Sequence, residues 1–268
     1  ITNQFNSITM ENQMKPESLL SKENQTRGTD TNVLINEEIL QKVLKLASDN
    51  GLKLRGHTLV WHSQTPEWFF HKDYNVDKSL VSKDVMRQRM ESYIKKVLTY
   101  CQENYPGVVY AWDVVNEYLH RGRAWSLNWT SVYGDMKGTP SYVKRAFERA
   151  YEMLEKYDAT DKVTLFYNDY DTYFEVEDLL ALVNFINEGE KAKICSGIGM
   201  QSHVDIKRPT IEEYGAALEK FMAAGYEVQI TELDFTINFN TDGSNPSYDY
   251  KNEGETIEEQ AAFVKDFM

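Results

Sequence analysis

The sequence predicts an α/β fold built on a parallel sheet, because strand-like and helix-like stretches alternate along almost its whole length. Two observations support this prediction. The strand-like runs are short and apolar, and the stretches between them carry apolar residues at helical spacing with recognisable start and stop signals. Such alternation implies parallel strands joined by right-handed crossovers. A doubly wound sheet and a (β/α)8 barrel both satisfy these observations.

Six strands and six helical stretches are expected. The strands are predicted at 5–8, 54–62, 108–117, 163–169, 196–204 and 227–234. The helices are predicted at 37–50, 83–104, 141–157, 175–188, 211–224 and from 257 onward.

The helix boundaries rest on capping signals. Asn36 can cap the first helix and Gly51 ends it, while Thr210 can cap the fifth. Thr256 and Glu259 have capping-box spacing at the start of the sixth. The faces expected to point inward are Ile39, Leu40, Val43, Leu44 and Ala47 in the first helix, and Val85, Met86, Met90, Ile94, Val97, Leu98 and Cys101 in the second.

The 268 residues suffice for one large domain, and no linker or low-complexity tract divides them, so residues 1–268 are predicted to form a single domain. The formal charge of -13 and the pI of about 4.9 disfavour nucleic acid and anionic membranes as partners. No membrane-spanning run occurs in the sequence. Its two cysteines, Cys101 and Cys195, lack metal spacing and are expected to be buried free thiols.

Polar side chains gather where the predicted strands end. Glu117 ends the apolar run VVYAWDVVNE, and a carboxylate there is costly to bury unless it has a partner or a task. The best candidate partner is Glu232 in EVQITELDF. Asn116 precedes Glu117, and Asn168 and Asp169 end their own strand in the same way. Both candidate folds place their sites at the carboxyl ends of the strands.

Alternation along the strands assigns side chains to faces. Gly197, Gly199, Gln201 and His203 are predicted to share one face, with two residues that lack side chains leaving room for a further group. In the second strand the shared face is predicted to hold Arg55, His57, Leu59 and Trp61. The opening strand leads into Glu11, Asn12 and Lys15.

Two carboxylates from different strands, close to His, Asn, Gln and Trp, suit acid–base and nucleophilic chemistry on a neutral substrate. The sequence has no Gly-rich phosphate loop, no GxSxG elbow and no HExxH or CxxC motif. Glycoside hydrolysis needs what is present, namely one protonated carboxyl group and one carboxylate. The aromatic content of 13% is compatible with a cleft that stacks sugar rings, although packing alone also accounts for it.

These residues resemble glycoside hydrolase family 10, the (β/α)8 TIM-barrel endo-β-1,4-xylanases. The motifs that carry the resemblance occur in family order along nearly the whole chain. They are FNSITMENQMK at 5–15, RGHTLVWHSQTPEW at 55–68, WDVVNE at 112–117, LFYNDY at 165–170, GIGMQSH at 197–203 and ITELD at 230–234.

The resemblance implies a retaining double displacement, with Glu117 as general acid/base and Glu232 as nucleophile. Donors such as His203 would keep Glu232 ionised, and burial with the neighbouring charge would keep Glu117 protonated. The resemblance also implies that Asn116 binds the sugar 2-hydroxyl. The remaining implied sugar-binding residues are Glu11, Asn12, Lys15, His57, Trp61, Gln201 and His203, and the implied supporting residues are Gln64, Asn168 and Asp234.

The resemblance further implies xylan and xylo-oligosaccharides as ligands, with no cofactor and no metal. A family barrel has one strand before the opening FNSI and a final strand after the seventh helix, so six of eight βα units are expected in this sequence. The missing strands, or additional modules, are expected from the rest of the gene product. The loop at 241–255 is expected to shape the leaving-group side. A polymeric substrate implies a secreted, periplasmic or cell-surface enzyme.

Two alternatives remain open at this point. One is a related barrel β-glucanase, which the RGHTLVWH and ENQMK motifs disfavour. The other is a catalytically impaired fragment that binds xylan. Both glutamates are present, which disfavours an evolved loss of catalysis.

Overall fold

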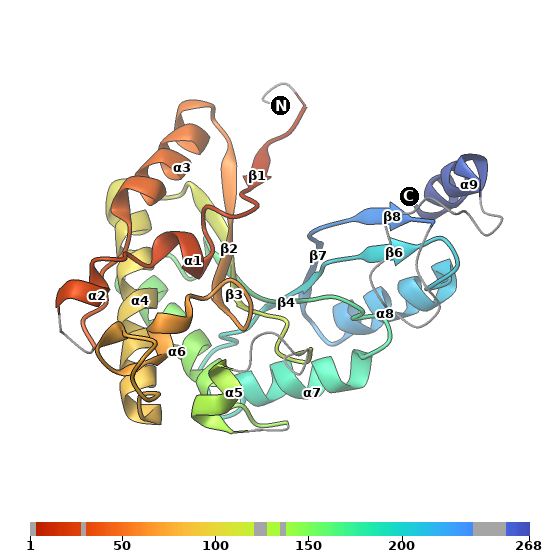
Figure 1. The fold of residues 1–268 in the computed structure, drawn as a ribbon. Coiled ribbons are helices and arrows are strands. Elements are labelled where there is room, and N and C mark those ends of the chain that lie inside the picture. Colours follow the sequence, from red (N-terminus) through yellow and green to blue (C-terminus); the bar gives the residue numbers. More distant parts are fainter. Residues whose placement is uncertain (1–3, 28–30, 121–127, 135–137, 238–255) are drawn as a thin grey trace.

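The computed structural model describes residues 4–27, 31–120, 128–134, 138–237 and 256–268. Its centre is a sheet of parallel strands in the order β1-β2-β3-β4-β5-β7. Figure 1 shows this sheet curling as a trough between the parts of the chain that contain α1–α6 and α8–α9. A separate pair of parallel strands, β6 and β8, extends the carboxyl-terminal side of the trough.

The strands are β1 Ser7–Thr9, β2 Lys53–Trp61, β3 Val109–Asn116, β4 Thr164–Asp169, β5 Gly197–Met200, β6 His203–Asp205, β7 Glu227–Ile230 and β8 Asp234–Thr236. The α-helices are α1 Pro16–Leu19, α2 Asn24–Arg27, α3 Glu37–Asp49, α4 Lys83–Asn104, α5 Asn128–Tyr133, α6 Ser141–Lys156, α7 Val176–Asn187, α8 Ile211–Ala223 and α9 Ile257–Phe267. Two 3-10 turns, η1 Glu67–Phe70 and η2 Lys72–Tyr74, follow β2.

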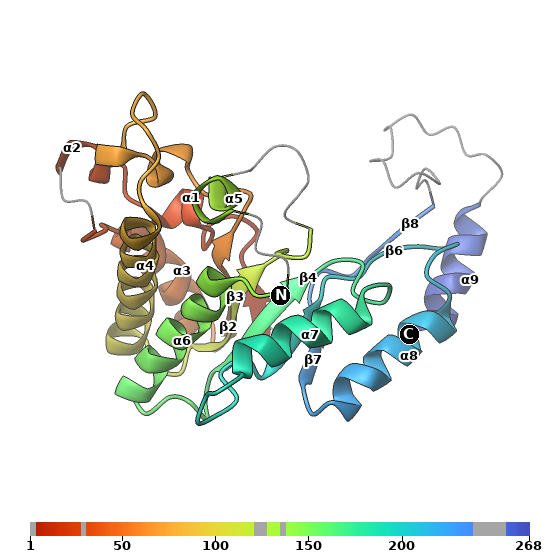
Figure 2. The ribbon, with the colours of Figure 1, turned by 90° about the horizontal axis from the view of Figure 1, so that it is seen from below.

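The long helices settle which parallel fold this is. Helices α3, α4, α6, α7 and α8 contact one another in chain order, and Figure 2 shows them in a row along one side of the curled sheet. A doubly wound sheet would carry helices on both faces. The one-sided cover and the curl are those of part of a (β/α)8 barrel. Among the described residues, β1 pairs only with β2 and β7 only with β5.

The predicted helix signals are confirmed. The Asn36 side chain accepts a hydrogen bond from the Ile39 N–H, and Thr210 and Thr256 each form a complete capping box. The predicted inward faces of α3 and α4 are buried, except that Ile39 and Val85 are half-buried. Cys101 and Cys195 are buried free thiols, as expected.

Three details of the strands differ from the prediction. The predicted strands 196–204 and 227–234 are each divided in two, because the chain leaves the sheet after Met200 and Ile230 and pairs again as β6 and β8. The opening strand lies at 7–9, not 5–8. Leu59 lies with Met90 and Tyr93 on the helix side, because a register shift within β2 interrupts the alternation.

The room predicted beside the two glycines of β5 is filled by the protein itself. A Cβ on Gly197 would overlap the Phe166 ring, and one on Gly199 would overlap the Asn168 amide. Arg55 lies over the same Phe166 ring, 4.3 Å from its centroid. Because Gly197 and Gly199 have no side chains, residues of β4 and β2 can pack beside β5 on the concave face of the sheet.

Arg55 crosses this concave face. Its guanidinium forms an ion pair with Asp113 of β3 and donates to Gln229 of β7. β2 and β7 are separated by three strands in the sheet order, so this contact is possible only because the sheet curls. No helix in the described ranges is both long and apolar enough to cross a membrane.

Replacement of Gly56 by Ala tests the packing between β2 and β3. An added Cβ would overlap the buried Trp112 indole, so we expect Gly56→Ala to lower the free energy of unfolding by about 1–3 kcal/mol. Equilibrium urea unfolding measures this loss. Gly215→Ala is the control, because a Cβ there meets open space on α8 and should stabilise the helix by about 0.5–1 kcal/mol. Equal stability of Gly56→Ala and the unmodified chain would contradict the packing described.

Candidate active site

Glu117 lies immediately after β3, where the chain turns with a positive φ of 57°. Its backbone N–H donates to the Asn168 carbonyl at 2.9 Å, which attaches this turn to β4. One carboxyl oxygen accepts a hydrogen bond from Gln201 Nε2 at 2.9 Å, and the other accepts from Trp61 Nε1 at 2.8 Å. The carboxyl group of Glu117 is thus held by donors from β2 and from the end of β5.

Glu232 lies in the short segment between β7 and β8. Its N–H donates to the Gln201 carbonyl at 3.0 Å. Oε1 accepts from Asn168 Nδ2 at 2.9 Å, and Oε2 lies 3.4 Å from His203 Nε2. The other ring nitrogen of His203 lies 2.6 Å from Asp234 Oδ2, so the imidazole bridges two carboxylates.

Three amide side chains connect the two glutamates, as the convergence of strand ends predicted. Asn168 Nδ2 donates both to Glu232 and to the side-chain oxygen Oδ1 of Asn116, the latter at 2.9 Å. Gln201 approaches the same oxygen of Asn116 at 3.3 Å while donating to Glu117. Thr231 Oγ1 donates to Asn168 Oδ1 at 2.7 Å and fixes the orientation of that amide. The two carboxyl groups therefore share one hydrogen-bond network.

The environments of the two glutamates shift their pKa values in opposite directions. Burial raises the pKa of Glu117, and the charges of Asp169 and Glu232 raise it further against the hydrogen bonds from Gln201 and Trp61. Burial alone would raise the pKa of Glu232 as well. The hydrogen bonds from His203 and Asn168 and the charge of His57 outweigh burial and lower it. Glu117 thus keeps its proton to a higher pH than an ordinary glutamate, and Glu232 is ionised down to a lower pH.

The His57 ring is held in place by the Asp113 carboxylate. Its Nδ1 lies 2.9 Å from Asp113 Oδ2, and Asp113 is buried beside the Arg55 guanidinium. Burial would raise the pKa of Asp113, but the charge of Arg55 and the bond with His57 lower it. Arg55 and Asp113 thus form a buried ion pair that supports the His57 side of the site.

The residues after β1 form a polar group on the same side as Trp61. Lys15 Nζ donates to Gln64 Oε1 at 2.7 Å and to Asn12 Oδ1 at 3.2 Å. It also lies 5.1 Å from the Trp61 ring centroid. Burial lowers the pKa of Lys15 although the charges of Glu232, Glu11 and Glu117 oppose the change. Glu11 is exposed and lies at the margin of this group.

His62 lies within the motif at 55–68, and the sequence predicts no role for it. Its Nε2 lies 3.8 Å from Glu117 Oε2, and burial lowers its pKa to about 4. Trp129 of α5 donates from Nε1 to the backbone carbonyl of Trp61 at 3.0 Å and so holds the end of β2 in place. Neither contact has a sequence signal, because both depend on how β2 and α5 pack. The predicted loop at 241–255 lies outside the described residues.

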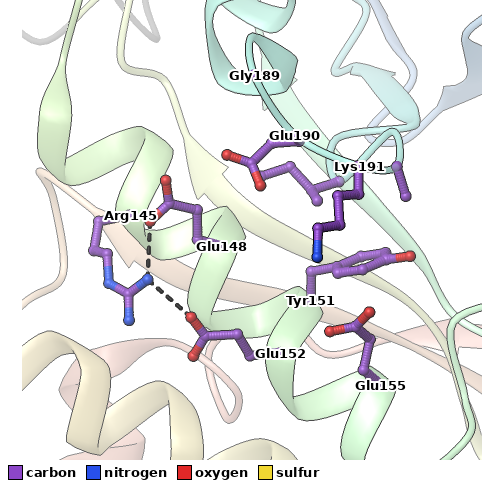
Figure 3. Close-up of a pocket in the computed structure, with 10 residues that line it drawn as sticks. Arg145, Glu148, Tyr151, Glu152, Glu155, Gly189, Glu190 and Lys191 are labelled. Carbon is purple, nitrogen blue, oxygen red and sulfur yellow. Dashed lines mark hydrogen bonds and ion pairs between the residues drawn. The ribbon is translucent and has the colours of Figure 1, made fainter.

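A cavity of about 370 Å³ lies away from this group, between α6 and the segment before β5. Figure 3 shows Glu148, Glu152, Glu155 and Glu190 around it, with Arg145 bound to Glu148 and Glu152. It is next to the amino-terminal end of β5, opposite the end that carries the two glutamates. Within the described ranges, no group of three or more His, Cys, Asp or Glu side chains is arranged to hold a metal ion.

Sequence comparisons agree with the arrangement of these motifs. The family model for Glycosyl hydrolase family 10 matches residues 1–268. Endo-1,4-beta-xylanase A of Butyrivibrio fibrisolvens is 41% identical over 261 residues, which cover 91% of this chain and 62% of the relative. Endo-1,4-beta-xylanase B of the same organism is 39% identical and is covered over 36% of its length. The chain thus spans less than two thirds of these relatives.

Solved structures give the same result. The CBM22-1–GH10 modules of endo-1,4-beta-D-xylanase 10B from Clostridium thermocellum, crystallised with xylohexaose, match with a TM-score of 0.73 and 37% identity. That match covers 87% of this chain and 47% of the other. An intracellular xylanase from Thermoanaerobacterium saccharolyticum matches with a TM-score of 0.74 and 32% identity, covering 99% of this chain and 73% of the other.

The histidines around the two glutamates should titrate far apart. The hydrogen bond with Glu232, together with that of Asp234, raises the pKa of His203 to about 9 against burial, whereas burial lowers that of His62 to about 4. We expect NMR titration of the ring nitrogens to resolve both values, and Glu232→Gln to lower that of His203. Coincident titration of both rings near pH 6.5 would contradict the geometry of the site.

The raised pKa of His203 also makes the free energy of unfolding depend on pH. The pKa of His203 in the folded chain lies above its unfolded value near 6.5, so its protonation stabilises the fold fully below that pH. This contribution should be lost as the pH rises toward about 9. Comparison of urea unfolding for His203→Gln and the unmodified chain at both pH values measures it.

Proposed function

The chain belongs to glycosyl hydrolase family 10, and from this premise we propose that it hydrolyses internal β-1,4-xylosidic bonds of xylan with retention of configuration. Glu117 acts as general acid/base and Glu232 as nucleophile. The observation that carries this proposal is the opposite displacement of their pKa values at one rim of the sheet. The relatives named endo-1,4-beta-xylanase support xylan as the substrate.

In the first step, a Glu232 oxygen attacks the anomeric carbon while Glu117 gives its proton to the glycosidic oxygen. The bond to the leaving sugar breaks, and a glycosyl ester with Glu232 remains. This mechanism requires the two carboxyl groups to stand roughly 5–5.5 Å apart. The network through Asn116, Asn168 and Gln201 supports such a close arrangement.

In the second step, the negative charge on Glu232 has been consumed by the ester. One of the charges that raise the pKa of Glu117 is then gone, so Glu117 can remain ionised and accept a proton from water. The activated water attacks the anomeric carbon and releases Glu232 as a carboxylate. Two inversions at one carbon give net retention.

The glycone would bind on the side of Trp61 and Lys15. Asn116 would bind the sugar 2-hydroxyl, while Asn12, Lys15 and Gln64 are already held in position by their mutual hydrogen bonds. Such preorganisation reduces the entropy lost on binding. His57 and Glu11 would complete the contacts. Gln201, Asn168, Asp234 and His203 would keep the two glutamates in place.

Three further points belong to this proposal. Residues 1–268 form one family 10 catalytic domain, which the whole-chain match of the family model supports. Additional modules are supported by the CBM22-1 module of the Clostridium thermocellum relative. The enzyme acts outside the cytoplasm, in a secreted, periplasmic or cell-surface form, because a polymer such as xylan cannot cross a membrane to reach a cytoplasmic enzyme.

Xylohexaose tests the reaction directly. NMR of the anomeric protons from the first minutes should show β-configured products of internal cleavage. α-configured first products would contradict retention. Intact xylohexaose, with retention of the chain on insoluble xylan, would favour a binding fragment. Faster cleavage of a β-1,4-glucan than of xylan would favour the glucanase.

A substrate with a good leaving group separates the two glutamates. With dinitrophenyl xylobioside, Glu117→Gln should still release an initial burst of dinitrophenol, because this leaving group needs no proton. Glu232→Gln should release no burst and lose roughly 10⁴-fold or more in turnover. A burst from Glu232→Gln but not from Glu117→Gln would exchange the two roles. Turnover by both variants at the rate of the unmodified chain would remove both assignments.

A further inference from the structure

An ion pair near Glu117, formed by Asp169 and His120, takes no part in the two steps above. Asp169, the last residue of β4, has no exposed surface. Its Oδ1 lies 2.8 Å from His120 Nδ1 and accepts from the Tyr170 N–H at 2.9 Å, while Tyr167 donates its hydroxyl proton to Oδ2. The His120 ring stacks on Tyr170 with centroids 3.7 Å apart. This carboxylate is fully enclosed and fully hydrogen-bonded.

The pair fastens the turn that Glu117 begins. The His120 N–H donates to the Glu117 carbonyl at 3.2 Å, and the Leu119 N–H donates to the Tyr167 hydroxyl at 3.0 Å. That hydroxyl in turn donates to Asp169. The turn 117–120 therefore reaches the end of β4 through its backbone and through the His120 side chain. Glu117, whose own φ is positive, is held from both ends.

The ionisable groups that face Glu117 differ in charge. His62 is 3.8 Å away and neutral above its pKa of about 4. Tyr167 is a neutral phenol, because burial raises its pKa well above the ordinary value. The charged neighbours are Asp169, Glu232 and Lys15.

Three carboxylates face His120. Besides Asp169 these are Glu175, whose Oε1 lies 3.6 Å from Nε2, and Asp171; the neutral ring of His62 is also near. Burial lowers the pKa of His120, but the bond with Asp169 and the three negative charges outweigh it and raise the pKa above the ordinary value. His120 therefore keeps its proton to a higher pH than an ordinary imidazole, and while it is protonated it balances the charge of Asp169.

We propose that Asp169 and His120 are positioning residues for Glu117, which together fix the turn after it and set the net charge beside it. This inference rests on the proposed role of Glu117 as general acid/base. While His120 is protonated, the pair is neutral overall. When His120 loses its proton at higher pH, the charge of Asp169 is no longer balanced, and the release of a proton from Glu117 becomes more costly. The pair thereby keeps the acid protonated over a wider pH range.

The test uses charge changes of opposite sign. Asp169→Asn keeps the shape but removes the negative charge, so the basic limb of the kcat/KM profile on xylohexaose should move down by about 0.5–1 pH unit. His120→Asn keeps a donor near the Nδ1 position but removes the positive charge, so the limb should move up by a similar amount. The double variant should return close to the unmodified profile. Glu177→Gln, which removes an exposed charge paired with Lys220, should leave the limb in place.

A second readout does not need activity. The pKa of Glu117, followed by carboxyl ¹³C NMR and assigned with Glu117→Gln, should move in the same directions in the same variants. If the chain hydrolyses xylohexaose but the two single variants do not shift the pKa of Glu117 in opposite directions, this inference is overturned and the proposed function stands. Opposite NMR shifts without hydrolysis would uphold the inference about Glu117 and contradict the proposed function.

If the pair had only a structural role, the variants would be slower, but the basic limbs of their pH profiles would stay in place or would move in the same direction in both single variants. Either result overturns the inference. If Asp169→Asn fails to fold by circular dichroism, His120→Asn decides alone. It must raise the pKa of Glu117, and an unchanged or lower pKa contradicts the charge balance described.

Discussion

The ion pair between Arg55 and Asp113 is the interaction on which the rest of the structure depends. Both side chains are almost fully buried on the concave face of the sheet. A carboxylate in that position is tolerable only with a charged partner and further hydrogen bonds, and Arg55 and His57 supply them to Asp113. Arg55 also reaches Gln229, so the pair ties the second strand of the sheet to the last.

The curl in turn brings the strand ends together. Glu117 follows β3 and Glu232 follows β7, and their carboxyl groups belong to one network only because β4 and β5 place Asn168 and Gln201 between them. The network treats the two carboxyl groups differently. Glu117 is more deeply buried and faces other negative charges, whereas Glu232 faces His203. This difference is what the proposed roles of an acid/base and a nucleophile require.

The sequence predicted much of this arrangement, because it depends on local signals. Capping boxes, helical periodicity and strand alternation placed the long helices, and polar residues at strand ends placed Glu117 and Glu232 on one rim. What it missed depends on contacts between distant residues. The space beside Gly197 and Gly199 is filled from β4, and the partnership of His120 with Asp169 follows from a turn whose geometry has no sequence signature.

A double-mutant cycle on Arg55 and Asp113 tests this account most directly. By equilibrium urea unfolding, Arg55→Met and Asp113→Leu should each cost about 3–5 kcal/mol, because each leaves an unpaired buried charge. The double variant should cost much less than the sum, since neither charge remains. Small and additive losses would show that the pair does not hold the sheet in its curl, and would contradict the central claim.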